Sequence, residues 1–244
     1  MQDPNIADIR DSLSYEEAFV GNPLVSVMIH TYHRAAILCE RTLPTVFFQT
    51  YDNWEVVIVG DGCEDDTGDR IEALRDARIR YSNLSANGPY PDDPIERSLA
   101  AGTYSANAAI AQVRGQWIAP LNDDDEWTED HIAILLREAQ RSRAELIYGM
   151  MRVLIEGTGE EATFGLWPPQ IGDFGFQAAI YHAGFSGFRV DPTAYQRGEP
   201  GDWDLARRML DAGVRFGFLP RIVGSYHLAP NHRGQAWWSE RARR

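Results

Sequence analysis

Residues 118–127 read I-A-P-L-N-D-D-D-E-W, an apolar run followed by four consecutive acidic residues. The apolar part, residues 118–121, is typical of a buried strand, and the acids at 123–126 come directly after it. Adjacent carboxylates repel one another, so a turn that only had to be polar has less costly residues available. The stretch therefore predicts a buried strand whose carboxyl end carries a charged site.

Further apolar runs in the first half predict more strands of the same kind. The expected strands are residues 24–29 (LVSVMI), 54–59 (WEVVIV), 78–82 and 116–121. Helix-like stretches lie between them, over 35–49 (with a kink at Pro44), 67–75 and 99–113, whereas 83–97 contains no obvious regular element. Apolar strands that alternate with helices are typical of a parallel α/β sheet covered on both faces.

The second half of the chain is less regular. Helices are expected over residues 131–140 and 203–212, and strands over 146–153, 214–219 and 222–226. Residues 156–175 are rich in glycine and proline and are expected to form a long loop, such as a lid or a binding loop.

Composition excludes several classes of protein. The chain has 244 residues and a net charge of −13, from 36 acids against 23 Lys and Arg, which argues against a nucleic-acid partner. The locally basic end, residues 240–244, is expected to be a solvated tail. Cys39 and Cys63 form no CxxC pair, so neither a zinc site nor a disulfide framework is expected. Neither a secretory signal nor a run of roughly 18 apolar residues is present, so we expect no integral membrane segment and a cytoplasmic location.

Polar groups follow three of the predicted strands. Residues 30–33 (HTYH) follow the first strand, Asp61 and Gly62 the second, and the acidic turn the fourth. In open α/β sheets, ligands bind beyond the carboxyl ends of the strands, so these groups are expected to share one cleft. No G-x-x-x-x-G-K-[ST] phosphate loop occurs, and Gly60-Asp61-Gly62 lacks the third glycine of a dinucleotide fingerprint.

The acidic turn is a candidate metal site. Without a phosphate loop, a bound diphosphate needs another source of positive charge. Mg²⁺ and Mn²⁺ prefer oxygen ligands and often combine one or two carboxylates with substrate phosphates. A cation would also relieve the repulsion within residues 123–125. The alternative is a solvated turn that leads into a helix, because acids favour the first turn of a helix.

Three segments taken together resemble the family 2 glycosyltransferases of GT-A fold. They are V-S-V-M-I-H-T-Y-H-R-A (25–35), Q-T-Y-D-N-W-E-V-V-I-V-G-D-G-C-E-D-D-T (49–67) and A-N-A-A-I-A-Q-V-R-G-Q-W-I-A-P-L-N-D-D-D-E-W (106–127). The usual pattern is a TYNR-like start, a QTY…E..VVDDGS.D.T block and a strand that ends in LD.DD.W, and here it spans about residues 24–130. A fainter match, G-D-W-D-L-A-R-R-M (201–209), looks like the ED.DL..R helix start of the family.

The resemblance implies a fold and an activity. The fold is α/β, a single GT-A domain over residues 1–244, with a mostly parallel Rossmann-like sheet flanked by helices and a smaller, less regular acceptor side. Its expected parts are an N-terminal extension (1–22), a nucleotide-sugar-binding half (23–127) and an acceptor-binding half (128–244). The implied activity is an inverting transfer of sugar from a UDP-, GDP- or dTDP-sugar to a hydroxyl acceptor, with Mn²⁺ or Mg²⁺ as cofactor, in polysaccharide, glycolipid or secondary-metabolite glycosylation.

The resemblance also assigns roles to individual residues. The expected nucleotide-sugar-binding residues are Thr31, Tyr32, Arg34, Asp61, Gly62, Asn122 and Asp123, and Arg97 is added as a cation that could reach the base or a phosphate. The expected metal ligands are Asp124, Asp125 and His227, the last from the segment after the final strand. Asp202 matches the position of the general base.

Three departures from the family pattern keep other functions open. Gly60, Asn122 and Gly201 stand where the family usually has acids. One alternative is therefore a glycosyltransferase-like domain that binds a sugar or a nucleotide without turnover. Another is a sugar nucleotidyltransferase, although residues 25–35 lack the glycine-rich basic loop of that class. The acceptor is not identified by the sequence, and a homodimer is left open as the assembly.

Overall fold

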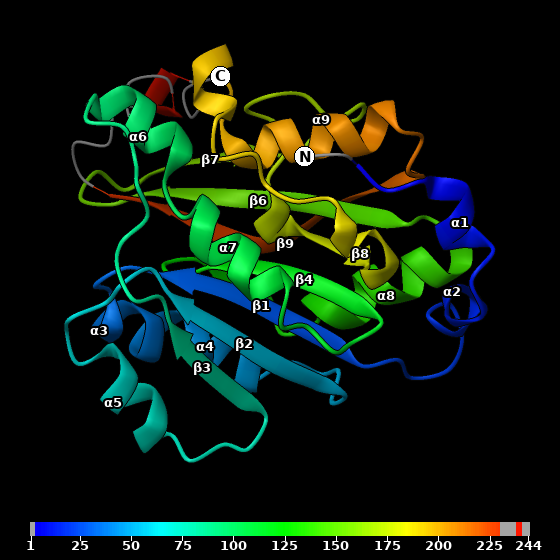
Figure 1. Cartoon of the computed structure of the whole chain (residues 1–244), viewed down its shortest axis with the longest axis horizontal. Coiled ribbons are helices and arrows are strands. Elements are labelled where there is room, and N and C mark those ends of the chain that lie inside the picture. The colour runs from blue at the N-terminus through cyan, green and yellow to red at the C-terminus, as the bar shows by residue number, and fades with distance from the viewer. Residues whose placement is uncertain (1–2, 230–237, 241–244) are drawn as a thin grey trace.

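The computed structural model describes residues 3–229 and 238–240, and Arg241–Arg244 of the basic tail lie outside this part. Within it, a nine-stranded sheet has the order β3-β2-β1-β4-β8-β6-β9-β5, and β7 pairs with β6 (Figure 1). The strands are β1 (Val25–Thr31), β2 (Trp54–Gly60), β3 (Ile79–Asn83), β4 (Trp117–Asn122), β5 (Glu126–Trp127), β6 (Leu146–Ile155), β7 (Glu160–Phe164), β8 (Ala179–His182) and β9 (Phe216–Leu228).

Helices and helical turns connect these strands. The α-helices are α1 (Ile6–Arg10), α2 (Leu13–Glu17), α3 (Ala35–Ile37), α4 (Leu43–Phe47), α5 (Thr67–Ala73), α6 (Pro94–Ala100), α7 (Thr103–Ile110), α8 (His131–Ser142) and α9 (Gly201–Asp211). A π-helical turn, η1 (Leu38–Thr42), joins α3 to α4, and three 3₁₀ turns follow later, η2 (Phe176–Ala178), η3 (Ala183–Gly187) and η4 (Ala194–Arg197).

The first half of the sheet is parallel, as predicted. β1 lies between β2 and β4, and β3 lies outside β2, with every pair in parallel register. All residues of β2 are buried, which agrees with a sequence that is apolar apart from Glu55, whose carboxylate accepts from the Ser26 hydroxyl at 2.7 Å. The chain extends from β1 to opposite sides of the sheet, toward β2 and toward β4. This reversal places a crevice at the carboxyl ends of the three strands, where ligands of α/β sheets bind.

The second half makes the sheet mixed. β8 pairs antiparallel with β4 and with β6, whereas β9 runs parallel to β6 and antiparallel to β5. The predicted α/β class is confirmed, but the sheet is mixed: all pairs of the first half are parallel, whereas the second half combines the parallel pair β6–β9 with antiparallel pairs. Pairing between β4 and β8 makes one continuous sheet from both halves of the chain.

Several predicted elements differ from the observed ones. The helix expected over 99–113 is α7, which begins only at Thr103, after Gly102 at φ 76°, whereas α6 begins within residues 83–97, where no regular element was expected. A Cβ atom at Gly102 would lie 2.4 Å from the His30 ring, so a continuous helix with a larger residue does not fit here. The helix expected over 35–49 is divided by η1, and Pro44 lies at the start of α4, where proline is tolerated.

The second half also contains strands that were not predicted. Part of the loop expected at 156–175 is β7, which forms a hairpin with β6, and β8 was not expected at all. The two strands expected within 214–226 are one strand, β9. Pro220 falls where the register between β6 and β9 shifts, because proline has no N–H for the ladder.

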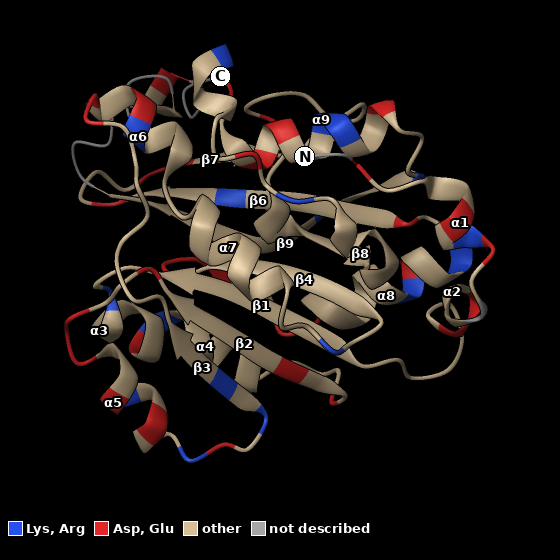
Figure 2. Cartoon of the chain, viewed as in Figure 1, with Lys and Arg blue, Asp and Glu red and all other residues tan. Residues whose placement is uncertain are grey.

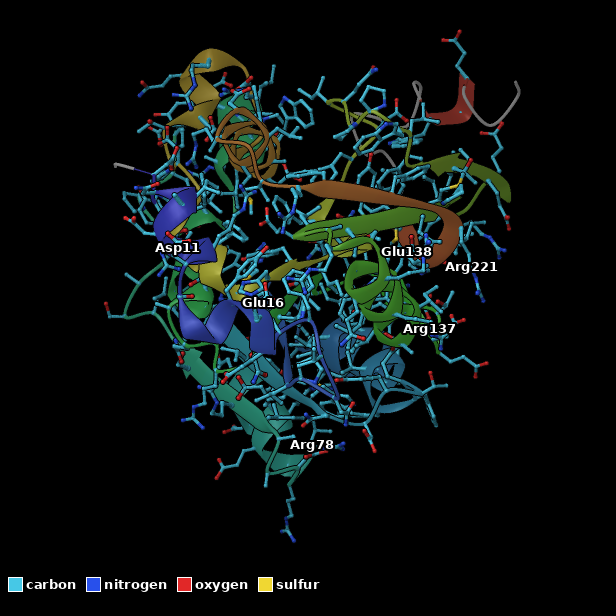
Figure 3. All side chains as sticks on the ribbon, turned by 90° about the vertical axis from the view of Figure 1, so that its right-hand side faces the viewer. Asp11, Glu16, Arg78, Arg137, Glu138 and Arg221 are labelled. Carbon is cyan, nitrogen blue, oxygen red and sulfur yellow. The ribbon has the colours of Figure 1, made fainter. Side chains whose placement is uncertain are left out.

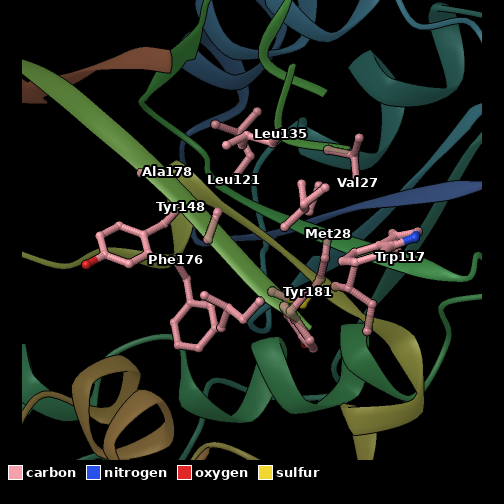
Figure 4. Close-up of a cluster of buried hydrophobic side chains, with 14 of the residues drawn as sticks. Val27, Met28, Trp117, Leu121, Leu135, Tyr148, Phe176, Ala178 and Tyr181 are labelled. Atoms are coloured by element: carbon pink, nitrogen blue, oxygen red, sulfur yellow. The ribbon is translucent and has the colours of Figure 1, made fainter. Parts of the chain in front are cut away.

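One core runs through both halves. Figure 4 shows it from β1 (Val27, Met28) to Trp117 on β4 and Tyr148 on β6, with the α8 residue Leu135 packed near Leu121. Charged residues gather on helices and loops, and the strands carry few of them (Figure 2). No helix within the described residues is both long and apolar enough to cross a membrane.

The N-terminal helices dock on the second half through Glu145, which is fully buried just before β6. Arg10 donates to both of its carboxylate oxygens, at 2.7 and 2.8 Å, and the Tyr15 hydroxyl donates to Oε1 at 2.6 Å. The Arg215 N–H donates to Oε2 at 2.8 Å. Burial alone would raise the pKa of Glu145, but these hydrogen bonds lower it overall. Figure 3 shows the side of the molecule where α1 and α2 lie, with Glu16 labelled on α2.

Candidate functional site

A cavity of about 370 Å³ opens at the carboxyl ends of β1, β2 and β4. Its volume falls in the range of small-molecule sites. It is lined by His30, Thr31, Tyr32, Arg34, Asp61, Asn87, Tyr90, Arg97, Ala101, Gly102, Ser105, Asn122, Asp123 and Asp124. The structure therefore brings together all of the predicted nucleotide-sugar-binding residues except Gly62. Gly62 does not line the cavity, but it directly follows Asp61, which does.

Asp61 is almost fully buried at one end of this cavity, with 2% of its surface exposed. The Gly88 N–H donates to its Oδ1 at 3.2 Å, and the Tyr90 hydroxyl donates to its Oδ2. The Asn87 side chain donates to the Asp61 carbonyl at 3.0 Å. Burial, and then the Asp61 carboxylate, raise the pKa of Tyr90, so its hydroxyl keeps its proton.

The loop that holds Tyr90 packs directly on the β2 end. Gly62 has φ 73°, and a Cβ atom there would lie 2.2 Å from the Asn87 backbone nitrogen. At Gly60 a Cβ atom would lie 2.4 Å from Asn83 Oδ1. The Asn83 side chain in turn accepts from the Cys63 N–H at 2.9 Å and donates to the Cys63 carbonyl at 2.8 Å. The departure at Gly60 thus has a steric reason, because Asn83 fills the space of the missing acid.

Asp123 and Asp124 face the cavity and share one positive partner. Arg34 Nη1 forms an ion pair with Asp124 Oδ2 and lies 3.5 Å from Asp123 Oδ1. Burial raises the pKa of Asp123, although the Thr31 hydroxyl and the Arg34 guanidinium oppose the rise. The acidic turn therefore presents the carboxylates of Asp123 and Asp124 to the cavity, and the Arg34 guanidinium lies between them.

Asp125 and His227 lie beneath the turn and do not line the cavity. Asp125 is fully buried and accepts from the His227 N–H at 3.1 Å and from Asn122 Nδ2 at 2.8 Å. Burial and the nearby Asp124 raise the pKa of Asp125 well above the usual aspartate range. The His227 ring lies 2.5 Å from Glu126 Oε2 and 3.4 Å from Glu156 Oε1. Ligand roles for Asp125 and His227 stay predictions.

A second cavity, of about 290 Å³, adjoins the first and shares His30, Ala101, Gly102 and Asn122 with it. Asp202, in the first turn of α9, lines this second cavity. Its Oδ1 accepts from the Trp203 N–H at 2.7 Å. Solvent reaches the side chain through the cavity, yet the surrounding protein raises the pKa of Asp202, opposed by the Trp203 N–H and by His30.

The glycine at position 201, next to the candidate base Asp202, also has a steric reason. A Cβ atom at this position would lie 2.7 Å from Val190 Cγ1 and 3.0 Å from Thr103 Cγ2. A glutamate, which is usual in the family, would not fit between these side chains without a shift of the backbone. The departure is thus explained by packing around Asp202.

Among residues 3–229 and 238–240, no three His, Cys, Asp or Glu side chains converge on one point as metal ligands. Asp123 and Asp124 nevertheless fit a cation that also takes substrate oxygens and water, because Mg²⁺ and Mn²⁺ commonly bind through one or two carboxylates. Arg34 between the two carboxylates shows that positive charge is stable there.

Two groups at the site were missed from the sequence. Asn87, Gly88 and Tyr90 belong to a stretch in which no regular element was recognised, but it follows the third strand, and the rule on strand ends would have pointed to it. Tyr226 on β9 is the other. Burial, followed by the charges of Asp125, Asp124 and Asp202, raises the pKa of Tyr226, which places it near these carboxylates. No sequence pattern indicated Tyr226.

The switch-point cavity and the mixed sheet define an α/β protein of the GT-A class. The model of the family described as Glycosyl transferase family 2 matches residues 26–90 and 101–193, which is more than half of the chain, and the protein belongs to this family.

Curated relatives match about half of the chain. A putative colanic acid biosynthesis glycosyl transferase, WcaA of Escherichia coli K12, is 32% identical over 125 residues, covering 50% of this chain and 39% of its own. The β-1,3-glucosyltransferase WfgD of Escherichia coli, described as acting from UDP-Glc on α-D-GlcNAc-diphosphoundecaprenol, is 26% identical over 132 residues, covering 54% and 47%. The protein thus spans less than half the length of these relatives.

Solved structures agree on the fold. TarS 1–349 of S. aureus in complex with UDP superposes with a TM-score of 0.66 at 16% identity, covering 84% of this chain and 61% of TarS 1–349. The mannosyltransferase PcManGT of Pyrobaculum calidifontis, in complex with GDP-Man and Mn²⁺, gives 0.60 at 15% identity, covering 90% and 61%. At such identities the likeness concerns the fold alone, and the predicted GT-A fold is confirmed.

Proposed function

We propose that the protein is an inverting glycosyltransferase that moves a sugar from a nucleotide diphosphate sugar to a hydroxyl acceptor. The observation that carries this proposal is the row formed by Asp61, the acidic turn and Asp202 along two adjoining cavities. This order suits a donor whose base lies at Asp61, whose diphosphate lies at the turn and whose sugar points toward Asp202.

A divalent ion, Mn²⁺ or Mg²⁺, is part of the proposal. Asp124 and Asp123 are the residues that would hold it, and a relative in fold was solved with GDP-Man and Mn²⁺. When bound, such an ion supplies positive charge beside the departing diphosphate. The ligand roles predicted for Asp125 and His227 stay part of this proposal, although neither side chain lines the cavity.

The residues of the chain have separate tasks in the transfer. Asp61 accepts a hydrogen bond from the base, and Arg34 offers a guanidinium to the phosphates. Asp202 takes the proton of the acceptor hydroxyl as its oxygen attacks the anomeric carbon. The raised pKa of Asp202 makes its carboxylate a better base at neutral pH. Attack opposite the leaving group in a single displacement inverts the anomeric centre.

The remaining predictions concern the setting of the reaction. Relatives in Escherichia coli and Bacillus subtilis are named for colanic acid and teichuronic acid biosynthesis, which supports a saccharide acceptor. We retain the division into an extension (1–22), a donor half (23–127) and an acceptor half (128–244) as part of this proposal. The cytoplasmic location and the homodimer also stay predictions.

Release of nucleoside diphosphate from UDP-, GDP- and dTDP-sugars, measured with Mn²⁺ and a panel of saccharide acceptors, tests the function. The Asp202→Asn variant should lose about 10²–10⁴-fold in transfer rate, because general-base catalysis contributes about this much. Its affinity for the nucleoside diphosphate should remain within about twofold, since Asp202 lies in the second cavity. Asp211→Asn, an exposed change on the same helix, is the matched control and should transfer normally.

The two alternative functions, a binding domain without turnover and a sugar nucleotidyltransferase, predict other results. A binding domain without turnover would bind nucleotide sugars but release no nucleoside diphosphate with any acceptor. A sugar nucleotidyltransferase would instead make a nucleotide sugar from a nucleoside triphosphate and a sugar phosphate. Either result would overturn the proposed function.

A further inference from the structure

The fold does not decide which base the first cavity accepts. One structural relative was solved with UDP and another with GDP-Man. Uracil and thymine present one ring N–H between two carbonyl oxygens, whereas guanine presents a ring N–H beside an exocyclic amine. Two adjacent donors pair best with both oxygens of one carboxylate. The hydrogen bonds that the two Asp61 carboxylate oxygens already accept therefore indicate which base can bind.

Both Asp61 oxygens already have donors from the protein. The Tyr90 hydroxyl is bonded to Oδ2, the Gly88 N–H lies 3.2 Å from Oδ1, and only 2% of Asp61 remains exposed. So little free surface suits one incoming N–H better than two.

Tyr90 is held in place from several sides. The Gly102 N–H, at the start of α7, donates to its hydroxyl oxygen at 3.1 Å. Its ring packs edge-on to Tyr104, with centroids 5.5 Å apart. A Cβ atom at Gly88 would lie 2.4 Å from Tyr104 Cδ2 and 2.9 Å from Tyr90 Cζ, so the loop backbone leaves these rings little room to turn. Tyr90 cannot easily release Oδ2 to a second donor.

We propose that Tyr90 is a specificity-determining residue. By occupying Asp61 Oδ2, it leaves Asp61 able to accept only one hydrogen bond from the base, and so selects uracil or thymine over guanine. The donor is then a uridine or thymidine diphosphate sugar. This inference rests on the proposed function, since it assumes that the base lies at Asp61.

Calorimetric titration of the full chain with UDP, dTDP and GDP, in the presence of Mn²⁺, tests the inference. Wild type should bind UDP and dTDP about tenfold or more tightly than GDP, because one amine of guanine would be left without a partner. In Tyr90→Phe, Oδ2 becomes free, and the preference for UDP over GDP should fall by about tenfold. Tyr104→Phe keeps the ring beside Tyr90 and both donors to Asp61, so it should keep the wild-type preference.

The outcomes separate this inference from the function on which it rests. Equal affinity of the wild type for UDP and GDP would overturn the inference alone, whatever the variants do. An unchanged preference in a Tyr90→Phe protein that melts cooperatively would overturn the role of Tyr90. If none of the three diphosphates bound, the proposed function itself would fall, and the inference with it.

Discussion

Asn122 donates its amide hydrogen to Asp125 Oδ2 at 2.8 Å, and Asp125 is fully buried beneath the acidic turn. The family usually has an acid at position 122, but here a second carboxylate would face a buried one. At the scale of single residues, the departures from the family pattern follow from their neighbours. Gly60 leaves room for Asn83, and Gly201 leaves room for Val190.

Asn122→Asp should therefore destabilise the protein. The change removes a hydrogen bond to a buried carboxylate and adds a like charge beside it, which we expect to cost about 2–4 kcal/mol at pH 7. Urea denaturation without metal measures the free energy of unfolding. Adding Asp124→Asn to this variant should restore part of the loss, because the Asp124 charge also acts on Asp125. A free energy equal to that of wild type would contradict the importance of this contact.

At the scale of the elements, the strands of the first half were predictable, including the five-residue β3, whereas the short strands β7 and β8 of the second half were not. β1, β2 and β4 are almost fully buried, so their sequences are mainly apolar, and the acidic turn directly follows β4. The buried polar exceptions Ser26 and Glu55 bond to each other. β7 and β8 have five and four residues, and their strand character comes from pairing with β6 and β4. Tyr90 was missed for a related reason, because only tertiary contacts bring its loop onto Asp61.

The first turn of α9 leads to a prediction on pH. The surrounding protein raises the pKa of Asp202, and only its ionised form can take the acceptor proton. As the pH falls through this raised pKa, kcat/KM should decline tenfold per pH unit, with a midpoint above the usual aspartate range. His30 faces Asp202, and its positive form lowers the pKa of Asp202. A pH–rate profile of His30→Gln should therefore have its acid limb at higher pH than wild type.

A different shape of the profile would be decisive. An acid limb within the ordinary aspartate range, or one that does not move in His30→Gln, would argue against Asp202 as the base. Circular dichroism at each pH separates loss of activity from loss of fold.

At the scale of the whole molecule, Glu145 joins three parts that are far apart in the sequence. It lies before β6, Arg215 lies before β9, and Arg10 and Tyr15 come from the N-terminal helices. Trp117 of β4 adds a contact to the same helices, because its Nε1 donates to the Ala18 carbonyl at 2.7 Å. The described part of the extension, residues 3–22, is thus packed on both halves of the sheet through the buried side chains of Glu145 and Trp117.

Glu145→Gln tests this junction. Removing the charge leaves Arg10 and Arg215 without their carboxylate, and because both side chains are partly exposed, we expect a loss of about 2–4 kcal/mol at pH 7. The folded pKa of Glu145 is lowered, so this stability is present above the pKa of the unfolded chain and disappears as the pH falls through the folded pKa. The difference in the free energy of unfolding between wild type and Glu145→Gln should therefore shrink in acid.

Glu16→Gln is the control, because it removes only the exposed pair with Arg143. It should change the free energy of unfolding by less than about 0.5 kcal/mol at any pH. Urea titrations of wild type and both variants at neutral and acidic pH measure the free energy of unfolding. An equally small loss in Glu145→Gln and in Glu16→Gln would contradict a stabilising role for the Glu145 contacts.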